Sequence, residues 1–121
     1  MSHRILIADD EPNMIVSLEF LMQREGYAVS VARDGVQALD MIRSERPDLV
    51  LLDGMMPGLS GFEVCEAVRA DPALSATRIL MLSAKGRETD IARGMGAGAD
   101  AYVVKPFSTR DLAQKIREML A

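Results

Sequence analysis

The 121-residue sequence contains few cysteines and histidines, no basic run and no long apolar run, and each of these scarcities argues against a kind of bond, site or partner. A single cysteine, Cys65, excludes an intramolecular disulfide, and we interpret it as a buried thiol on a helix. The one histidine, His3, has no second histidine to join it and is interpreted as a bystander. No basic run offsets the net charge of −4, so we expect no nucleic-acid binding by this segment. No apolar run suits a transmembrane helix or signal peptide, which predicts no membrane contact and a cytoplasmic location.

The length and the 49% of hydrophobic residues fit one domain, residues 1–121. Short apolar runs alternate with longer segments of helical period, which is the pattern of βα units on a parallel sheet. Most of these runs are unbroken, as expected for strands covered on both faces. The predicted strands are ILIA (5–8), YAVSVA (27–32), DLVLLD (48–53), RILMLS (78–83) and AYVVK (101–105). We therefore predict an α/β fold with a doubly wound, five-stranded parallel sheet and five helices.

Apolar residues at helical spacing mark the helix faces that should pack on this sheet. Pro12 suits a first helical turn, and Ser60 with Glu63 predicts a capping box at the start of the third helix. Three glycines in RGMGAGAD (93–100) predict a less stable end of the fourth helix, either a frayed end or a mobile switch element. The apolar positions are Met14, Ile15, Leu18, Leu21 and Met22, then Val36, Leu39 and Ile42, and finally Leu112, Ile116 and Leu120.

Carboxylates follow two of the predicted strands at the point where each strand ends. Asp9 and Asp10 follow the first strand, and Asp53 ends the third, which is its neighbour in such a sheet. In open α/β sheets the ligand crevice lies at the carboxyl ends of strands beside the topological switch point. Three carboxylates held together repel, so either one takes up a proton or a cation neutralises them. Oxygen ligands without a histidine or cysteine cluster favour Mg²⁺.

Polar groups also follow the fourth and fifth predicted strands. Ser83 in LSA and Lys105 in VVKPF stand at the level of Asp53. Taken singly, the aspartate and the serine suit helix caps, and the lysine suits a solvated loop. Taken together, a carboxylate, a metal site, a hydroxyl and an ammonium are the parts of a phosphoryl-transfer site.

Over its whole length the chain resembles the receiver domain of bacterial two-component response regulators. The segments that carry the resemblance are ADDEP (8–12), LLDGMMPGLSG (51–61), LSA (82–84) and GADAYVVKPF (98–107). The resemblance implies a flavodoxin-like sheet with strand order 2-1-3-4-5 and a phosphorylation-dependent switch in a phosphorelay. Asp53 would be the phosphoacceptor, supplied by a sensor histidine kinase, a histidine phosphotransfer protein or a small acyl phosphate.

The resemblance further implies that the domain catalyses its own Mg²⁺-dependent phosphorylation and dephosphorylation. Mg²⁺ would be bound by Asp10, Asp53 and the backbone carbonyl of Met55, with Asp9 acting through water. Lys105 would supply the remaining cation beside the phosphoryl group.

Ser83 and Tyr102 are the switch residues that the resemblance implies. The phosphoryl group would draw the Ser83 hydroxyl inward, and Tyr102 would turn inward with it; the alternative is an ordinary half-buried tyrosine. Pro106 resembles the family's cis proline, which aims the preceding ammonium, although trans is the general form. Met55 and Lys85, each two residues past a functional group, stand where relatives tune the lifetime of the phosphoryl group.

Some positions depart from the family pattern. Gly54 replaces a bulky aliphatic residue, which predicts a looser loop after Asp53. Ile91 and Ala101 replace charged residues that pair receivers in some DNA-binding subfamilies, so we expect a monomer or a weak phosphorylation-dependent dimer. The output partner, a separate protein or a fused output domain, is expected at the face of the fourth helix, fifth strand and fifth helix.

Two other classes of protein share part of this pattern. A phosphatase of the haloacid dehalogenase type also forms an aspartyl-phosphate, but it needs a second aspartate where this chain has Met55. A flavodoxin-like electron carrier shares the fold, but Asp9, Asp10 and Glu11 would repel the flavin phosphate.

Overall fold

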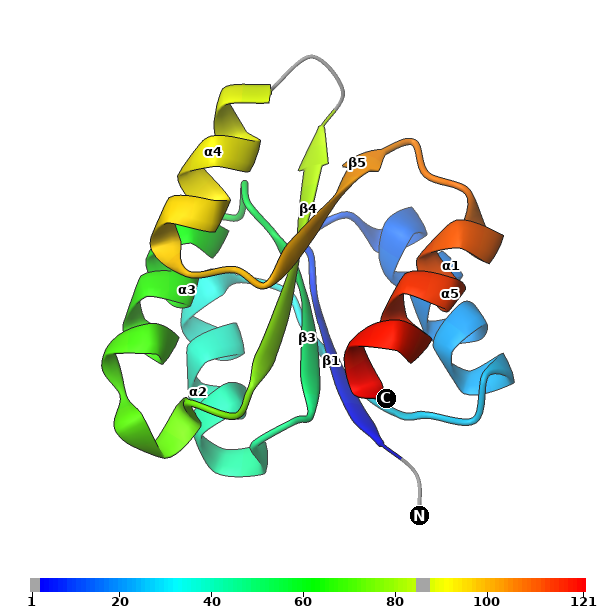
Figure 1. Ribbon diagram of the computed structural model, residues 1–121, viewed down its shortest axis with the longest axis horizontal. Helices are drawn as coiled ribbons and strands as arrows, with labels where there is room; N and C mark the ends of the chain where they lie inside the picture. The colour runs from blue at the N-terminus through cyan, green and yellow to red at the C-terminus, as the bar shows by residue number, and fades with distance from the viewer. Residues whose placement is uncertain (1–2, 85–87) are drawn as a thin grey trace.

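Five parallel strands form one sheet in the computed structural model of the chain, which describes residues 3–84 and 88–121. The strand order is β2-β1-β3-β4-β5, as the resemblance implies (Figure 1). Every predicted strand is present, and each of its ends lies within one residue of the predicted end. The strands are β1 Arg4–Ala8, β2 Ala28–Ala32, β3 Leu49–Asp53, β4 Arg78–Ala84 and β5 Ala101–Lys105.

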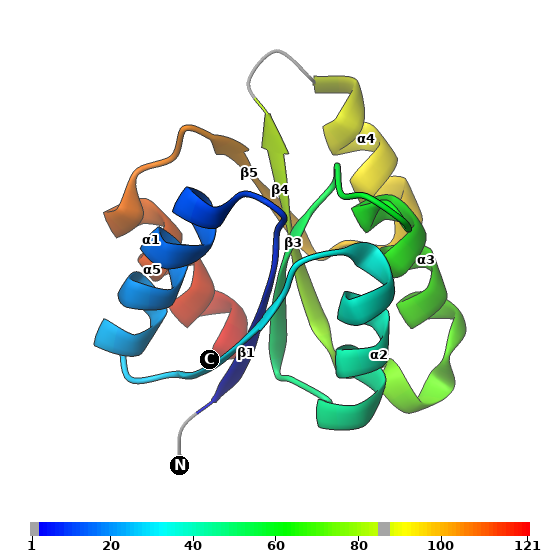
Figure 2. The ribbon, with the colours of Figure 1, turned by 180° about the vertical axis from the view of Figure 1, so that it is seen from behind.

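Helices cover both faces of the sheet, as Figures 1 and 2 show from opposite sides. One face is covered by α1 (Pro12–Arg24) and α5 (Thr109–Leu120). The other is covered by α2 (Gly35–Glu45), α3 (Gly61–Ala70) and α4 (Glu88–Ala97), and a short 3-10 turn at Pro72–Leu74 follows α3. In the part of the chain that the structure describes, no helix combines the length and the apolar character needed to cross a membrane.

The core consists of two layers because alternate residues along each strand face opposite sides of the sheet. Ile7 and Leu51 pack with α1 and α5, whereas Leu6 and Val50 pack with α2 and α3. All four side chains are at most 1% exposed, and burying each contributes about 1.5–3 kcal/mol relative to exposure. Both faces are therefore apolar, which explains the unbroken hydrophobic runs in the sequence.

The helix boundaries follow the local signals in the sequence. Pro12 is the first residue of α1, and Ser60 and Glu63 form both halves of a capping box at α3. Gly98 follows α4 with a φ of 110°, and the amide of Ala99 donates to the carbonyl of Gly94, which closes the helix end. Each of these helices therefore begins or ends where its sequence indicates.

One predicted core position is wrong, because the side chain of Val36 is 52% exposed. The buried stripe of α2 consists of Gly35, Ala38, Leu39 and Ile42. Gly35 packs so tightly on the backbone of Leu59 that a side chain there would collide with it. This contact turns the adjacent valine away from the sheet.

The register of the strands brings their carboxyl ends to one edge. Ala8 pairs with Leu52, so the residue after β1 and the last residue of β3 come level. Asp53 pairs with Leu82, and Ala84 pairs with Lys105. The predicted polar residues therefore belong to strand ends that meet at one edge of the sheet, and in Figure 1 the strands run upward to this edge.

Candidate functional site

Three carboxylates meet at this edge of the sheet. Asp9 and Asp10 follow β1, Asp53 ends β3, and one carboxylate oxygen from each lies within 4.8 Å of the others. Asp9 is fully buried, Asp53 is partly buried and Asp10 is exposed. The sequence predicted this cluster from the strand ends alone, and the structure contains it.

Lys105 supplies the positive charge of the site from the end of β5. Its Nζ lies 3.1 Å from Oδ2 of Asp9 and 3.7 Å from Oδ2 of Asp53. The other oxygen of Asp9 accepts a hydrogen bond of 3.0 Å from the amide of Glu11. A fully buried carboxylate needs such partners, because removing it from water without them costs several kcal/mol. Sequence reasoning missed this amide, because a backbone donor leaves no signal in the residue type.

Asp53 is held in a fixed orientation and carries a raised pKa. Its Oδ1 accepts a hydrogen bond of 3.1 Å from the amide of Met55, while its Oδ2 faces Lys105. Burial raises its pKa from 3.8 to about 6, and the charges of Asp9 and Asp10 add to this rise. The Met55 amide and the Lys105 ammonium oppose the rise without cancelling it. Among the residues that the structure describes, one ammonium against three carboxylates leaves a surplus of negative charge, which is what a cation site requires.

The residues at this edge fit a small, hard divalent cation. The cluster consists of carboxylates, and oxygen ligands at this spacing suit Mg²⁺ or Ca²⁺ better than a transition metal. Asp10 is exposed and Asp53 is partly exposed, so a hydrated ion has access to both. Met55 follows in the adjacent loop with 51% of its surface exposed.

Ser83 and Pro106 lie beside the strand ends that carry the cluster, Ser83 in β4 and Pro106 directly after Lys105. Ser83 is 4% exposed near the end of β4, and its hydroxyl lies 3.5 Å from the carbonyl oxygen of Ala84. The peptide bond between Lys105 and Pro106 is cis, which is the form the resemblance implies.

Tyr102 is 40% exposed, with the Lys115 ammonium 5.9 Å from its ring centre, so its ring lies on the outer side of β5. Lys85, predicted to tune the phosphoryl lifetime, lies outside the described residues.

The loop after Asp53 is more tightly held than the glycine at position 54 predicts. Gly54 is buried, its amide lies 3.3 Å from the carbonyl oxygen of Leu82, and its carbonyl accepts from the amide of Gly61 at 3.0 Å. The ring of Phe62 fills the space beside it: a Cβ built on Gly54 would lie 2.8 Å from the ring's Cζ. At this position α3 therefore supplies the bulk that the glycine lacks.

Comparison with known proteins identifies the family. The sequence model of the response regulator receiver domain matches residues 5–117. The chain belongs to this family. It is 44% identical to the DNA-binding response regulator MtrA of Mycolicibacterium smegmatis over 120 residues, which cover 99% of this chain and 51% of that protein. The chain thus spans about half the length of this relative.

Solved receiver structures share the fold. A CheY-like response regulator receiver domain protein from Methanospirillum hungatei superimposes with a TM-score of 0.91 at 32% identity, covering 99% of this chain and 94% of that one. The BeF3-activated DrrB receiver domain superimposes with a TM-score of 0.87 at 28% identity, covering 99% and 98%. This receiver domain therefore belongs to two-component signalling, and the comparisons give no support to the phosphatase alternative.

Proposed function

We propose that residues 1–121 form one receiver domain that acts as a phosphorylation-dependent switch, with Asp53 as its phosphoacceptor. The main support is the placement of the Asp53 carboxylate, which is oriented by a backbone amide and a lysine. Its side chain is 13% exposed, so a phosphodonor has access to it. Asp9 is fully buried and already paired, which leaves Asp53 as the held carboxylate that a donor can reach.

The chemistry of this proposal is a displacement at phosphorus. An oxygen of Asp53 forms a bond to phosphorus, and the bond from phosphorus to the donor breaks. The donor is the imidazole of a phosphohistidine or the carboxylate of an acyl phosphate, and it leaves with the electron pair. Lys105 lies beside the attacking carboxylate and neutralises charge on the transferred group.

Two carboxylates and one backbone carbonyl are the proposed direct ligands of a divalent cation. Asp10, Asp53 and the carbonyl of Met55 would bind Mg²⁺ directly, and Asp9 would act through water. When bound, the ion neutralises the phosphoryl oxygens and the surplus charge of the cluster. The acidic cluster supports this assignment through its oxygen-only donor set.

The switch is proposed to run through Ser83 and Tyr102. Ser83 is buried near the acceptor, and its hydroxyl is suited to move toward a new phosphoryl oxygen. Tyr102 lines a groove between β5 and α5 with Phe107 and Lys115. Inward rotation of Tyr102 would reshape this groove, so we place the output contact there.

The partners follow from the same proposal. A sensor histidine kinase or histidine phosphotransfer protein supplies the phosphoryl group, and an output protein or fused output domain reads it. MtrA is named as DNA-binding and is about twice as long as this chain. Because the net charge here is −4, we propose that any DNA contact is made by another domain.

Nuclear magnetic resonance with beryllium fluoride, which imitates a phosphoryl group, tests this function. Wild type with Mg²⁺ and beryllium fluoride should show shifted amide resonances at Ser83, Tyr102 and residues of α4 and α5. Asp53→Asn should show no such shifts, and Asp40→Asn, an exposed carboxylate on α2, should behave like wild type. An unchanged wild-type spectrum would contradict the proposal.

A further inference from the structure

One face of α3 holds α4 against the sheet. Phe62, Cys65 and Arg69 are spaced by three and four residues, so they form one stripe along α3. Each of them contacts α4 or the residue directly after it, namely Arg93, Ala97 or Gly98. The two ends of this stripe differ in their chemistry.

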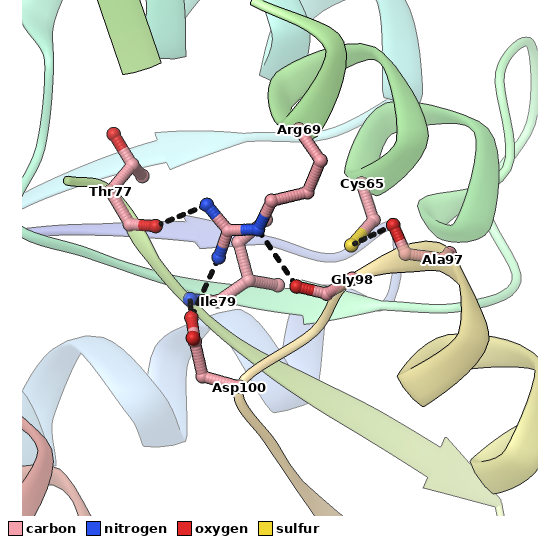
Figure 3. Close-up of polar contacts among 7 residues, drawn as sticks. All are labelled: Cys65, Arg69, Thr77, Ile79, Ala97, Gly98 and Asp100. Carbon is pink, nitrogen blue, oxygen red and sulfur yellow. Dashed lines mark hydrogen bonds and ion pairs between the residues drawn. The ribbon is translucent and has the colours of Figure 1, made fainter. Parts of the chain in front are cut away.

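The far end of the stripe is a polar anchor, drawn in Figure 3. The Arg69 guanidinium donates to the carbonyl of Gly98 at 2.8 Å, the carbonyl of Thr77 at 2.8 Å and the carboxylate of Asp100 at 2.7 Å. The same carboxylate oxygen accepts from the amide of Ile79 at 2.8 Å. We call these four bonds the Arg69 clamp. The clamp joins the C-terminal end of α4 to α3 and to the start of β4.

The other end of the stripe is an aromatic contact beside the phosphorylation site. Phe62 is 1% exposed, and the Arg93 guanidinium carbon lies 4.3 Å from the centre of its ring. This distance is within the range of a cation–π interaction. The tip of the same ring points at Gly54, where a Cβ would lie 2.8 Å from Cζ and 3.1 Å from Cε2. The ring therefore fills the space between α4 and the loop after Asp53.

Gly54 connects this ring to the reacting carboxylate. Gly54 follows Asp53 directly in the chain. Its amide lies 3.3 Å from the carbonyl oxygen of Leu82, which is the residue before Ser83. Its carbonyl accepts a hydrogen bond of 3.0 Å from the amide of Gly61. A shift of the loop when Asp53 is modified must therefore displace the ring or break these bonds. The ring in turn bears on α4 through Arg93.

We propose that Phe62 and Arg93 are positioning residues of the phosphorylation site. The ring, held between Gly54 and the Arg93 guanidinium, fixes the loop after Asp53 and couples it to α4, whose opposite end is held by the Arg69 clamp. This route leads to α4, whereas the one through Ser83 and Tyr102 leads to the groove between β5 and α5. It depends on the absence of a side chain at position 54. It rests on the proposed function, because Asp53 must accept the phosphoryl group.

The first test measures the rate at which acetyl phosphate and Mg²⁺ add a phosphoryl group, read by intact mass. Arg93→Gln should slow the reaction about threefold to tenfold, which is the size of one lost cation–π contact. Arg93→Lys keeps the cation and should restore most of the rate. Arg43→Gln removes an equal charge from an exposed position of α2, and it should stay within about twofold of wild type.

The second test is a double-mutant cycle between the loop and the ring. Gly54→Ala should slow the reaction, because its methyl group displaces the ring. Phe62→Leu should also slow the reaction, because it leaves a void and removes the face that holds Arg93. The double variant should react faster than Gly54→Ala alone, because the shorter side chain makes room for the methyl group. Thermal melting of each variant checks that it is folded.

The third measurement does not depend on catalysis. In wild type, the Nε–H resonance of Arg93 should shift when Mg²⁺ and beryllium fluoride are added, and in Phe62→Leu this shift should disappear. Equal phosphorylation rates for Arg93→Gln and Arg43→Gln, or strictly additive effects on that rate in the double-mutant cycle, would overturn this proposal. Labelling of wild type in the same experiment would still support the proposed function. No labelling of wild type would overturn the proposed function and this proposal with it.

Discussion

Replacing Asp53 with asparagine should stabilise the folded protein when no divalent cation is present. The side chain of Asp53 is only 13% exposed and belongs to a cluster of three carboxylates, and the Lys105 ammonium is the one that lies beside it among residues 3–84 and 88–121. Burial, together with the charges of Asp9 and Asp10, raises its pKa from 3.8 to about 6. The ionised carboxylate therefore destabilises the folded state at neutral pH, and asparagine removes that charge.

The magnitude follows from the shift in pKa. A rise of about two units corresponds to about 3 kcal/mol, because each unit is about 1.4 kcal/mol. Below the unfolded pKa of 3.8 the group is protonated in both states and costs nothing. As the pH rises toward about 6, the unfolded state loses its proton first and the stability of wild type falls. The full advantage of Asp53→Asn should therefore be present at about pH 7.5 and nearly absent at about pH 4.

Urea denaturation followed by circular dichroism, with a chelator present, measures this difference. A gain of about 3 kcal/mol also predicts a melting temperature about 10 °C higher for a domain of this size. Asp40→Asn serves as the control and should change stability by less than about 0.5 kcal/mol. Adding Mg²⁺ should narrow the gap, because a ligand that binds the folded wild type stabilises it. A variant no more stable than wild type at neutral pH, or a gap that persists in acid, would refute the reasoning.

Three further predictions concern the helices around the site. Cys65 is fully buried and burial raises its pKa to about 11, so a thiol-reactive dye should label the native protein far more slowly than the protein in denaturant; equal rates would contradict its burial. Gly96→Ala should raise the free energy of unfolding by up to about 1 kcal/mol in urea titrations, because nothing lies within 4 Å of the added methyl group. Gly94→Ala should raise it less, because its methyl group would lie 3.3 Å from Met81. A larger gain in unfolding free energy for Gly94→Ala than for Gly96→Ala would contradict this packing. Arg69→Gln should lower the unfolding free energy by about 2–4 kcal/mol, since it breaks three charge-assisted hydrogen bonds, and a loss below about 0.5 kcal/mol would mean that the Arg69 clamp contributes little.

The strands were predictable because both faces of the sheet are covered, which forces nearly continuous apolar runs. The error at Val36 has a specific cause. The buried stripe of α2 begins at Gly35, which has no side chain. A search for hydrophobic residues therefore selects the adjacent Val36 as the buried position instead. Gly35 packs on Leu59, which lies in a loop more than 20 residues away along the chain. The spacing of hydrophobic residues within α2 therefore cannot predict this contact.

The carboxylate cluster and Lys105 were predictable for a topological reason. Parallel strands end at one edge, so residues at the strand ends meet there whatever their separation along the chain. The contact between Gly54 and Phe62 was not predictable in the same way. Glycine at position 54 indicates freedom when only its neighbours are considered, whereas the ring that removes this freedom comes from α3. The carbonyls held by Arg69 are backbone groups, which no residue type reveals.

The most direct measurement is the intact mass of the protein after incubation with acetyl phosphate and Mg²⁺, followed by mapping of the modified peptide. Wild type should gain one phosphoryl group on Asp53, and neither Asp53→Asn nor wild type with a chelator should gain it. An adduct of equal yield on Asp53→Asn, or a wild-type adduct on a different residue, would contradict the assignment of Asp53 as the phosphoacceptor.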